Sequence, residues 1–191
     1  RIDDTDLERS KQVYEDEIKR DLEWLGIEWD FCEKQSTRFD RYYEVLENLK
    51  SKNKIYPCYE TKSELDLKRK KQLNMGKPPI YDRVALKLSL EDHKKFEEEG
   101  KKAHWRFLLD KKKICWNDEI IGTVSIDLES LSDPVFVKED GQFLYTLASV
   151  CDDIDFCITH VVRGSDHLTN TATQIQLIQD LGFNVPIYGH H

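Results

Sequence analysis

A run of mostly β-branched residues, Ile158 to Val162, ends in an arginine that polar residues follow closely. The run predicts a strand, and in open parallel sheets ligands bind in the loop that leaves the carboxyl end of a strand. At that position Arg163 could present its planar, permanently charged fork to a carboxylate or a phosphate. Asp166 and His167 could hydrogen-bond a ribose or a base, or they could cap the following helix. The segment is therefore a candidate ligand site.

Two groups of closely spaced carboxylates are further candidates: Asp3, Asp4 and Asp6, and Asp152, Asp153 and Asp155. The second group offers Arg163 an ion-pair partner, which is the structural alternative to a bound ligand. Both groups resemble hard-cation sites in composition, but neither has the spacing of a calcium loop. The sequence therefore predicts no metal at either group.

The chain has none of the patterns typical of an activated nucleophile or a phosphate-binding loop. It lacks G-x-S-x-G and GxxxxGK[ST], and no Cys and His pair is suggested by spacing. The chemistry that remains is binding, positioning and the stabilisation of charge.

Five helices are predicted to carry and surround these residues. Apolar spacing and helix-end signals place them over 10–25, 37–50, 61–74, 91–99 and 170–181. The first has Ser10 as its cap, Tyr14 and Ile18 on an apolar face, and Gly26 in the left-handed position after its end. The third opens with a Thr-x-x-Glu capping box.

Between the helices, alternating or β-rich stretches predict strands over 84–88, 105–109, 120–126, 134–138 and 143–146. Asp140-Gly141 suits a type I′ turn that would join the last two into a hairpin. The middle of the chain is therefore mixed α and β, and the end is a strand, a loop and a helix.

Charge divides the chain. The formal net charge of −8 argues against a nucleic-acid partner when it is taken whole. Residues 62–113, however, hold sixteen basic and nine acidic side chains, a balance of +7, whereas the remainder carries −15. This basic segment is either a solvated lysine-rich face or a surface that meets phosphates. Composition leaves both open.

Cysteine use and hydropathy indicate the compartment. The five cysteines are an odd, scattered set without C-x-x-C, namely Cys32, Cys58, Cys115, Cys151 and Cys157. This pattern is typical of reduced thiols in the cytosol, so we expect a cytoplasmic protein. No stretch approaches the roughly 18 apolar residues of a membrane span, and we expect no membrane partner. Because the chain begins at Arg1, we expect it to be part of something longer.

Four motifs in order resemble those of bacterial glutamyl-tRNA synthetases, which are class I enzymes. They are Arg1 to Ser10 (R-I-E-D-T-D-x-x-R-S), Tyr56 to Tyr59 with Tyr81-Asp82 (Y-x-C-Y…Y-D), Asp133 to Val135 with Asp140 to Asp153 (D-P-V…D-G-x-P-x-Y-x-x-A-x-x-x-D-D), and Ile158 to His167 with Asn170-Thr171 (I-T-H-V-I-R-G-E-D-H…N-T). The resemblance covers the whole chain.

The resemblance implies an α/β fold: a class I synthetase Rossmann-like parallel sheet interrupted by a mixed α/β insertion that binds the tRNA acceptor stem. Residues 1–56 and 141–191 would form the two parts of the catalytic domain, and 57–140 the insertion. The implied activity is that of a glutamate–tRNA ligase, which activates glutamate to glutamyl-adenylate with ATP and transfers it to the 3′ end of tRNA. ATP with Mg²⁺ would enter as a substrate complex, and the partners would be tRNA, L-glutamate and ATP. We expect a monomer.

Site residues follow from the matching positions. The resemblance implies that Arg163 pairs with the substrate γ-carboxylate, that Tyr145 hydrogen-bonds nearby, that Asp3 receives the α-amino group, and that Ser149 lies near the glutamate. Asp166 and His167 would face the adenylate. The basic segment falls where the family inserts its acceptor-stem domain, which favours phosphate contacts. The expected tRNA-binding residues are Arg9, Lys68, Arg69, Lys70 and Lys71.

Several positions depart from the family pattern. Asp3 is one methylene shorter than the usual Glu, Ser149 replaces a common Asn, and Ser165 replaces a Glu. Glu60 stands where zinc-containing members have a second cysteine after Cys58, so no zinc is expected.

The H-I-G-H-like and K-M-S-K-S-like motifs of the family would lie outside these residues, and both stabilise ATP phosphates. The 191 residues alone are therefore expected to have little or no aminoacylation activity. Two alternatives remain: a shortened paralogue that glutamylates a modified tRNA base, of the glutamyl-queuosine type, and a non-catalytic module that binds tRNA or an amino acid.

Overall fold

The computed structural model describes residues 1–191 and contains six α-helices and seven strands. The helices are α1 (Gln12–Trp24), α2 (Phe39–Ser51), α3 (Lys62–Asn74), α4 (Leu90–Glu98), α5 (Tyr145–Asp155) and α6 (Leu168–Leu181). The strands are β1 (Ile55–Cys58), β2 (His104–Phe107), β3 (Lys113–Asp118), β4 (Gly122–Asp127), β5 (Val135–Val137), β6 (His160–Arg163) and β7 (Ile187–His190). No helix combines the length and apolar character that crossing a membrane requires.

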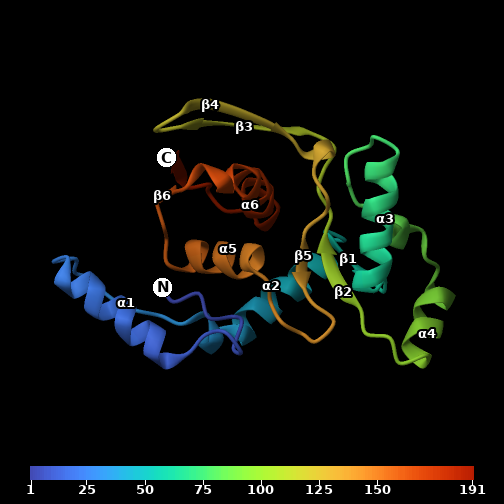
Figure 1. Cartoon of the computed structure of the whole chain (residues 1–191), viewed down its shortest axis with the longest axis horizontal. Coiled ribbons are helices and arrows are strands. Elements are labelled where there is room, and N and C mark those ends of the chain that lie inside the picture. Colours follow the sequence, from blue (N-terminus) through green and yellow to red (C-terminus); the bar gives the residue numbers. More distant parts are fainter.

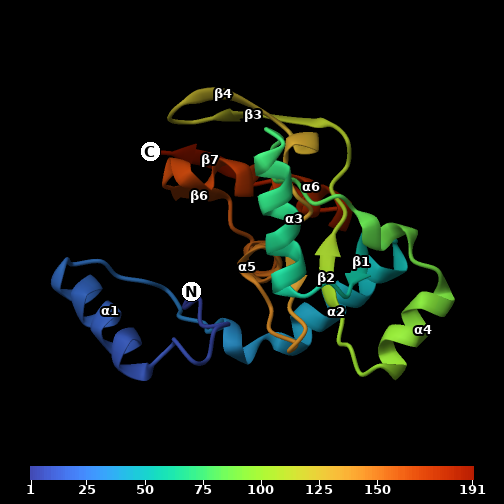
Figure 2. The same ribbon diagram turned by 45° about the vertical axis from the view of Figure 1, so that its right-hand side comes forward.

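The strands form three small sheets. β1, β2 and β5 make an antiparallel sheet in that order, and β3 and β4 make a hairpin that arches over α6 (Figure 1). β6 and β7 are parallel and pair Arg163 with His190, with α6 as the crossover between them (Figure 2). The parallel sheet expected from the sequence is thus represented here by one βαβ unit, which is the arrangement that places ligands at strand ends.

The main hydrophobic core has 21 buried residues and joins α2, α5 and α6 to the sheets, whereas α1, α3 and α4 contribute none of them. Leu46 on α2, Phe107 on β2, Phe136 on β5 and Leu177 on α6 are all buried members. The rings of Phe107 and Phe136 stack with centroids 4.9 Å apart. Because β2 and β5 share this core with α2, α5 and α6, residues of the 57–140 segment are packed onto the residues that flank it. The three-part division of the chain stays a prediction.

Helix α1 lies at the edge of the molecule, on the side away from α3 and α4 (Figure 1). Its predicted apolar face is only partly covered, since Tyr14 and Ile18 remain about half exposed. The predicted Ser10 cap is wrong: Lys11 is at the N-cap, without a side-chain cap bond. Gly26 takes φ +71°, as predicted for the residue after the helix.

The capping box of α3 is confirmed. Glu64 donates its backbone N–H to the Thr61 hydroxyl at 3.3 Å, and Thr61 donates its own N–H to the Glu64 carboxylate at 2.7 Å. These bonds satisfy backbone donors that the first turn leaves free. The box forms because its four residues are neighbours in sequence and need no tertiary partner.

Two strand predictions and one turn prediction are corrected. Residues 84–87 form a short 3₁₀-helix rather than a strand, and α5 begins at Tyr145, inside the expected strand 143–146. The turn before it is not type I′, because Gly141 has a positive φ but Asp140 does not. β1, β3 and β7 carry no strong β-rich run and were not expected. Their strand geometry depends on pairing with β2, β4 and β6.

The burial of His104 on β2 can be tested by the pH dependence of stability. Burial, together with the charge of Arg106, lowers the pKa of His104 from 6.5 to about 4. In the unfolded chain the ring binds a proton near pH 6.5, so its contribution to stability is complete above that pH and is lost as the pH falls towards 4. Between pH 7 and pH 4 the wild type is expected to lose about 2 kcal/mol more unfolding free energy than His104→Leu. Urea unfolding at both pH values checks this, and equal losses in both proteins would contradict it.

Candidate functional site

Arg163 is the last residue of β6, and side chains of α5 and α6 hold its guanidinium group. Its Nη1 donates to the Tyr145 hydroxyl at 2.8 Å. Its Nη2 donates to Thr171 Oγ1 and to Gln174 Oε1, both at 2.6 Å. Thr171 and Gln174 are three residues apart on α6 and therefore share one face of the helix. The fork is held in one orientation at the carboxyl end of the strand.

The charge of Arg163 is not neutralised by a carboxylate hydrogen-bonded to it. Its three partners are neutral side chains, and it makes no ion pair. In addition, three buried polar atoms around it have no hydrogen-bond partner: Arg163 Nε, Gln174 Nε2 and Tyr188 Oη. Burial raises the pKa of Tyr188, so its hydroxyl keeps a proton to donate. Since unpaired buried donors are costly, this group is suited to an acceptor-rich ligand such as a carboxylate.

The loop after β6 brings His167 to this group but leaves Asp166 in solvent. The rings of His167 and Tyr145 meet edge to face with centroids 5.7 Å apart. The side chain of Asp166 is 82% exposed and lies 3.9 Å from His167 Nε2. The capping alternative for both residues is wrong, because α6 has no side-chain cap bond.

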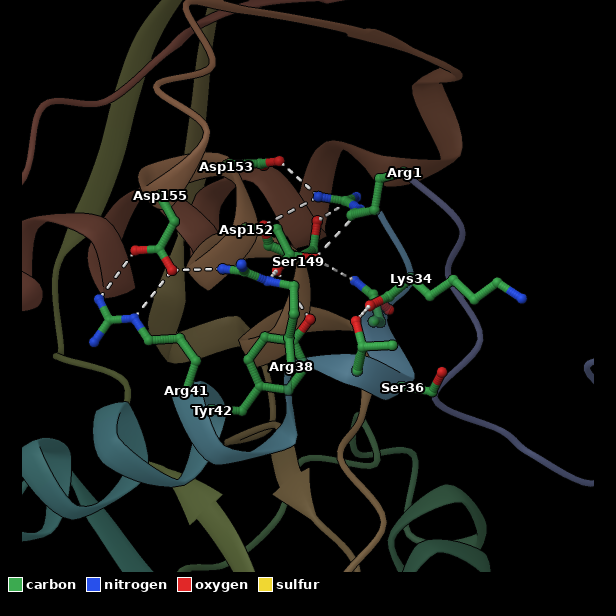
Figure 3. A network of polar contacts seen from close by, with 12 residues as sticks. Arg1, Lys34, Ser36, Arg38, Arg41, Tyr42, Ser149, Asp152, Asp153 and Asp155 are labelled. Atoms are coloured by element: carbon green, nitrogen blue, oxygen red, sulfur yellow. Dashed lines mark hydrogen bonds and ion pairs between the residues drawn. The ribbon is translucent and has the colours of Figure 1, made fainter. Parts of the chain in front are cut away.

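Arg1 connects the remaining residues of the predicted glutamate site (Figure 3). Its Nε donates to Asp3 Oδ1 at 2.7 Å and its Nη2 to Ser149 Oγ at 3.2 Å. Its Nη1 donates to Asp153 Oδ1 at 2.8 Å. Ser149 is one helical turn after Tyr145 on α5, so the Arg1 group and the Arg163 group lie along the same helix face. The structure thus gathers Asp3, Ser149, Tyr145 and Arg163 around α5.

Asp152 is fully buried below this face and is hydrogen-bonded on both oxygens. It accepts bonds from Gln35 Nε2 at 3.0 Å, from Arg38 Nε at 2.8 Å and from the Tyr42 hydroxyl at 2.9 Å (Figure 3). Arg1 Nε lies 3.6 Å from the same carboxylate. These bonds clamp α5 to α2 and to the segment that carries Arg1.

Asp155 completes the network at the end of α5. Arg38 Nη2 donates to its carboxylate at 2.5 Å, and Arg41 Nε at 3.0 Å (Figure 3). Burial tends to raise the pKa of Asp155, but Arg41 and Arg38 outweigh it and hold that pKa below its usual value. The aspartates of α5 pair with arginines of the N-terminal part of the chain, so the expected alternative of an ion pair with Arg163 is wrong.

The predicted tRNA-binding residues divide into two kinds. Lys68 Nζ pairs with Glu60 at 3.1 Å and with Asp82 at 3.2 Å, and Arg69 pairs with Asp66 at 3.3 Å. Lys70 and Lys71, in contrast, are exposed and make no ion pair. Side chains of α3 line a cavity of about 380 Å³ whose basic residues are Lys68, Arg69, Lys71, Lys77 and Arg106. Arg9 is exposed beside Asp6 and precedes α1, the helix that lies on the side of the molecule away from α3 (Figure 1).

Glu60, which stands where zinc-containing relatives are expected to have a second cysteine, takes part in a hydrogen-bonded group with Cys58 and Tyr81. The Cys58 thiol lies 3.6 Å from the Tyr81 hydroxyl, which donates to the Glu60 carboxylate at 3.0 Å. Burial raises the pKa of the Cys58 thiol to about 11. The absence of zinc stays a prediction.

Sequence reasoning missed the polar residues that hold Arg163 and Asp152. Thr171 and Gln174 interrupt the apolar residues of α6, and both are buried. Their spacing of three on a predicted helix is a signal that could have pointed to them. Arg1 and Arg38 had no such signal, because their partners on α5 are more than 100 residues away.

The chain matches, over residues 1–191, the family model described as tRNA synthetases class I (E and Q), catalytic domain. It is 59% identical over its whole length to glutamate–tRNA ligase 1 of Paracoccus denitrificans and 58% identical to glutamate–tRNA ligase 1 of Ruegeria pomeroyi. It spans 43% of the length of each of these curated relatives.

A solved glutamate tRNA ligase from Elizabethkingia meningosepticum, in complex with its amino acid, has the same fold. The TM-score is 0.90 at 31% identity, and the match covers 100% of this chain and 41% of that one. The expected class I catalytic fold is therefore confirmed.

Proposed function

We propose, since this chain belongs to the catalytic-domain family of class I tRNA synthetases for glutamate and glutamine, that it is part of a glutamate–tRNA ligase. In the whole protein this region would bind glutamate and ATP, form glutamyl-adenylate and pass the glutamyl group to the 3′ end of tRNA. We further propose that the protein is a monomer and that it acts in the cytoplasm.

The observation that carries this proposal is the Arg163 group. Its guanidinium is held by Tyr145, Thr171 and Gln174, and all three are neutral. A bound γ-carboxylate would neutralise the charge and could accept from the unpaired Arg163 Nε. A glutamine amide would leave the charge without a partner, and sites with such unpaired groups discriminate strongly.

The Arg1 group is the proposed site for the other end of the amino acid. Asp3 offers a carboxylate for the α-amino group, and Ser149 offers a hydroxyl on the same face of α5. In the structure both contact Arg1. We propose that Arg1 keeps the Asp3 side chain directed towards α5, so that the shorter Asp can serve where Glu is usual.

Activation needs no protein nucleophile, because the α-carboxylate of glutamate itself attacks the α-phosphate of ATP and pyrophosphate leaves. The contribution of these residues is to hold the carboxylate in line and to exclude water. His167, beside Tyr145, and Asp166 in the same loop are the proposed contacts to the adenylate. Mg²⁺ would arrive with ATP as part of the substrate complex.

For the acceptor stem, Lys70 and Lys71 are the proposed phosphate contacts, because they have no ion pair to break. The double variant Lys70→Ala/Lys71→Ala is expected to weaken tRNA binding and to reduce the slope of log K against log salt by about 1 to 2, since each contact releases about one counterion. Filter binding of tRNA at several salt concentrations measures both the affinity and the slope. The matched control removes Lys94 and Lys95, two exposed lysines of α4. A slope equal to that of the wild type would contradict the assignment.

ATP–pyrophosphate exchange on the full-length protein tests the activity. In the presence of tRNA the wild type is expected to exchange with glutamate and not with glutamine. These 191 residues alone are expected to exchange little. A full-length protein that binds tRNA but shows no glutamate-dependent exchange would be a non-catalytic module, and the proposal would be wrong.

A further inference from the structure

A buried histidine at the end of β7 connects the inserted segment to the partners of Arg163. His190 is fully buried, and its Nδ1 lies 2.5 Å from Oδ2 of Asp118, the last residue of β3. The backbone N–H of His190 also donates to Asp118 Oδ1 at 2.9 Å. On the other side of the ring, Nε2 lies 2.8 Å from Thr171 Oγ1, which accepts from Arg163 Nη2 at 2.6 Å. Four residues thus form one continuous chain of hydrogen bonds.

The Asp118 carboxylate determines where the protons of this chain lie. Burial opposes its ionisation, but bonds from His190, Ile120 and Ile121 hold the pKa of Asp118 far below its usual range. The carboxylate can only accept, so Nδ1 of His190 carries the ring proton. In the neutral imidazole, whose single ring proton is then on Nδ1, Nε2 accepts the hydroxyl hydrogen of Thr171. The lone pairs of Thr171 remain free for Arg163.

Thr171 has one other acceptor for its hydroxyl hydrogen, the backbone carbonyl of His167 at 3.2 Å. His190 Nε2 is nearer, at 2.8 Å. Without the imidazole the hydroxyl would turn back towards the preceding helical turn, a common alternative for threonine in helices. The Thr171 oxygen would then point its lone pairs in another direction, and Arg163 would lose one of its three partners.

We propose that His190, held by Asp118, is a positioning residue for the amino-acid pocket and acts on Arg163 through Thr171. The inference rests on the proposed function. It adds that β3, from the inserted segment, helps to build the pocket. Such outer partners commonly orient the group that meets the ligand.

Two substitutions of His190 separate its two bonds. In His190→Asn the amide can still donate to Asp118 from the Nδ1 position, but no atom reaches Thr171. In His190→Gln the amide oxygen can accept from Thr171 at the Nε2 position. In full-length protein, assayed by ATP–pyrophosphate exchange with tRNA, His190→Asn is expected to raise KM for glutamate about 10-fold, the value of one charge-assisted hydrogen bond, with KM for ATP unchanged. His190→Gln is expected to stay within about 3-fold of the wild type.

Variants of Thr171 provide the second test and do not depend on His190→Asn folding. Thr171→Val should raise KM for glutamate as much as His190→Asn, and Thr171→Ser, which keeps the hydroxyl, should remain near the wild type. Adding His190→Asn to Thr171→Val should change KM for glutamate by less than about 2-fold further, because valine has already removed the hydroxyl through which His190 acts on Arg163.

Three outcomes would overturn the inference: an unchanged KM in Thr171→Val, additive effects in the double variant, or equal rises in KM for glutamate and ATP in both His190 variants. The wild-type assay separates the two proposals. A wild type without glutamate-dependent exchange would overturn the proposed function and this inference together. An active wild type with any of the three outcomes would overturn this inference alone.

Discussion

Replacing Arg163 with leucine in the full-length protein is expected to reduce kcat/KM for glutamate in ATP–pyrophosphate exchange by about 1,000-fold or more. The reason is that a bound γ-carboxylate would lose its charged partner, a loss of about 3–5 kcal/mol when one member of a buried charge pair is removed. Arg163→Lys is expected to reduce kcat/KM by about 100-fold, a value between those of the wild type and Arg163→Leu. Its ammonium group keeps the charge but cannot form the planar fork that Tyr145, Thr171 and Gln174 hold.

The substrate preference provides a sharper test than the rate. Without the positive charge, the ratio of glutamate to glutamine exchange should fall towards one in Arg163→Leu, because nothing in the pocket would then favour an anion. Arg20→Leu is the matched control, since Arg20 on α1 is exposed and unpaired and the same charge is removed. A normal KM for glutamate in Arg163→Leu would contradict the assignment.

Replacing Asp152 with asparagine is expected to cause the largest loss of stability of any single change in the network. The carboxylate accepts from Gln35, Arg38 and Tyr42 and is completely buried. An asparagine of the same shape would turn an NH₂ group towards these donors and remove one of the two carboxylates that pair with Arg38. Breaking a buried pair in this way costs about 3–5 kcal/mol. In thermal unfolding of the full-length protein, the transition of this domain should fall by about 10 °C.

Glu44→Gln is the control for that experiment. Glu44 pairs with Arg41 at 3.1 Å, but its side chain is 69% exposed. Exposed pairs contribute about 0–1 kcal/mol, so its transition should shift by less than about 2 °C. If Asp152→Asn unfolded at the same temperature as Glu44→Gln, the clamp between α5 and α2 would not stabilise the domain.

The Asp152 clamp also has a functional consequence. Arg1 is within 3.6 Å of Asp152 and is bonded to Asp3 and Ser149. Loosening Asp152 would therefore release the segment that carries the proposed site for the α-amino group. Asp152 would thus support the proposed site through Arg1 without contacting the amino acid itself.

The sequence by itself determined the features that depend on neighbouring residues. The capping box of α3 and the left-handed Gly26 need only a few adjacent positions, and the structure has both. The strand that ends in Arg163 was also predictable from its β-branched run, although it begins at His160 rather than Ile158. The order of four motifs led to the class I synthetase family, which the comparisons confirm.

Only the tertiary structure decided how the polar groups are paired. Arg38 and Asp152 are 114 positions apart, and Asp118 and His190 are 72 apart, so no local period connects them. The same holds for α5, where the apolar residues around 143–146 suited a strand until packing on α2 and α6 favoured a helix. Lys68 and Lys70 are equally basic in the sequence, but only Lys68 meets two carboxylates. Local interactions specify the ends of elements, whereas the charge state and orientation of a site depend on groups that folding brings together from distant parts of the chain.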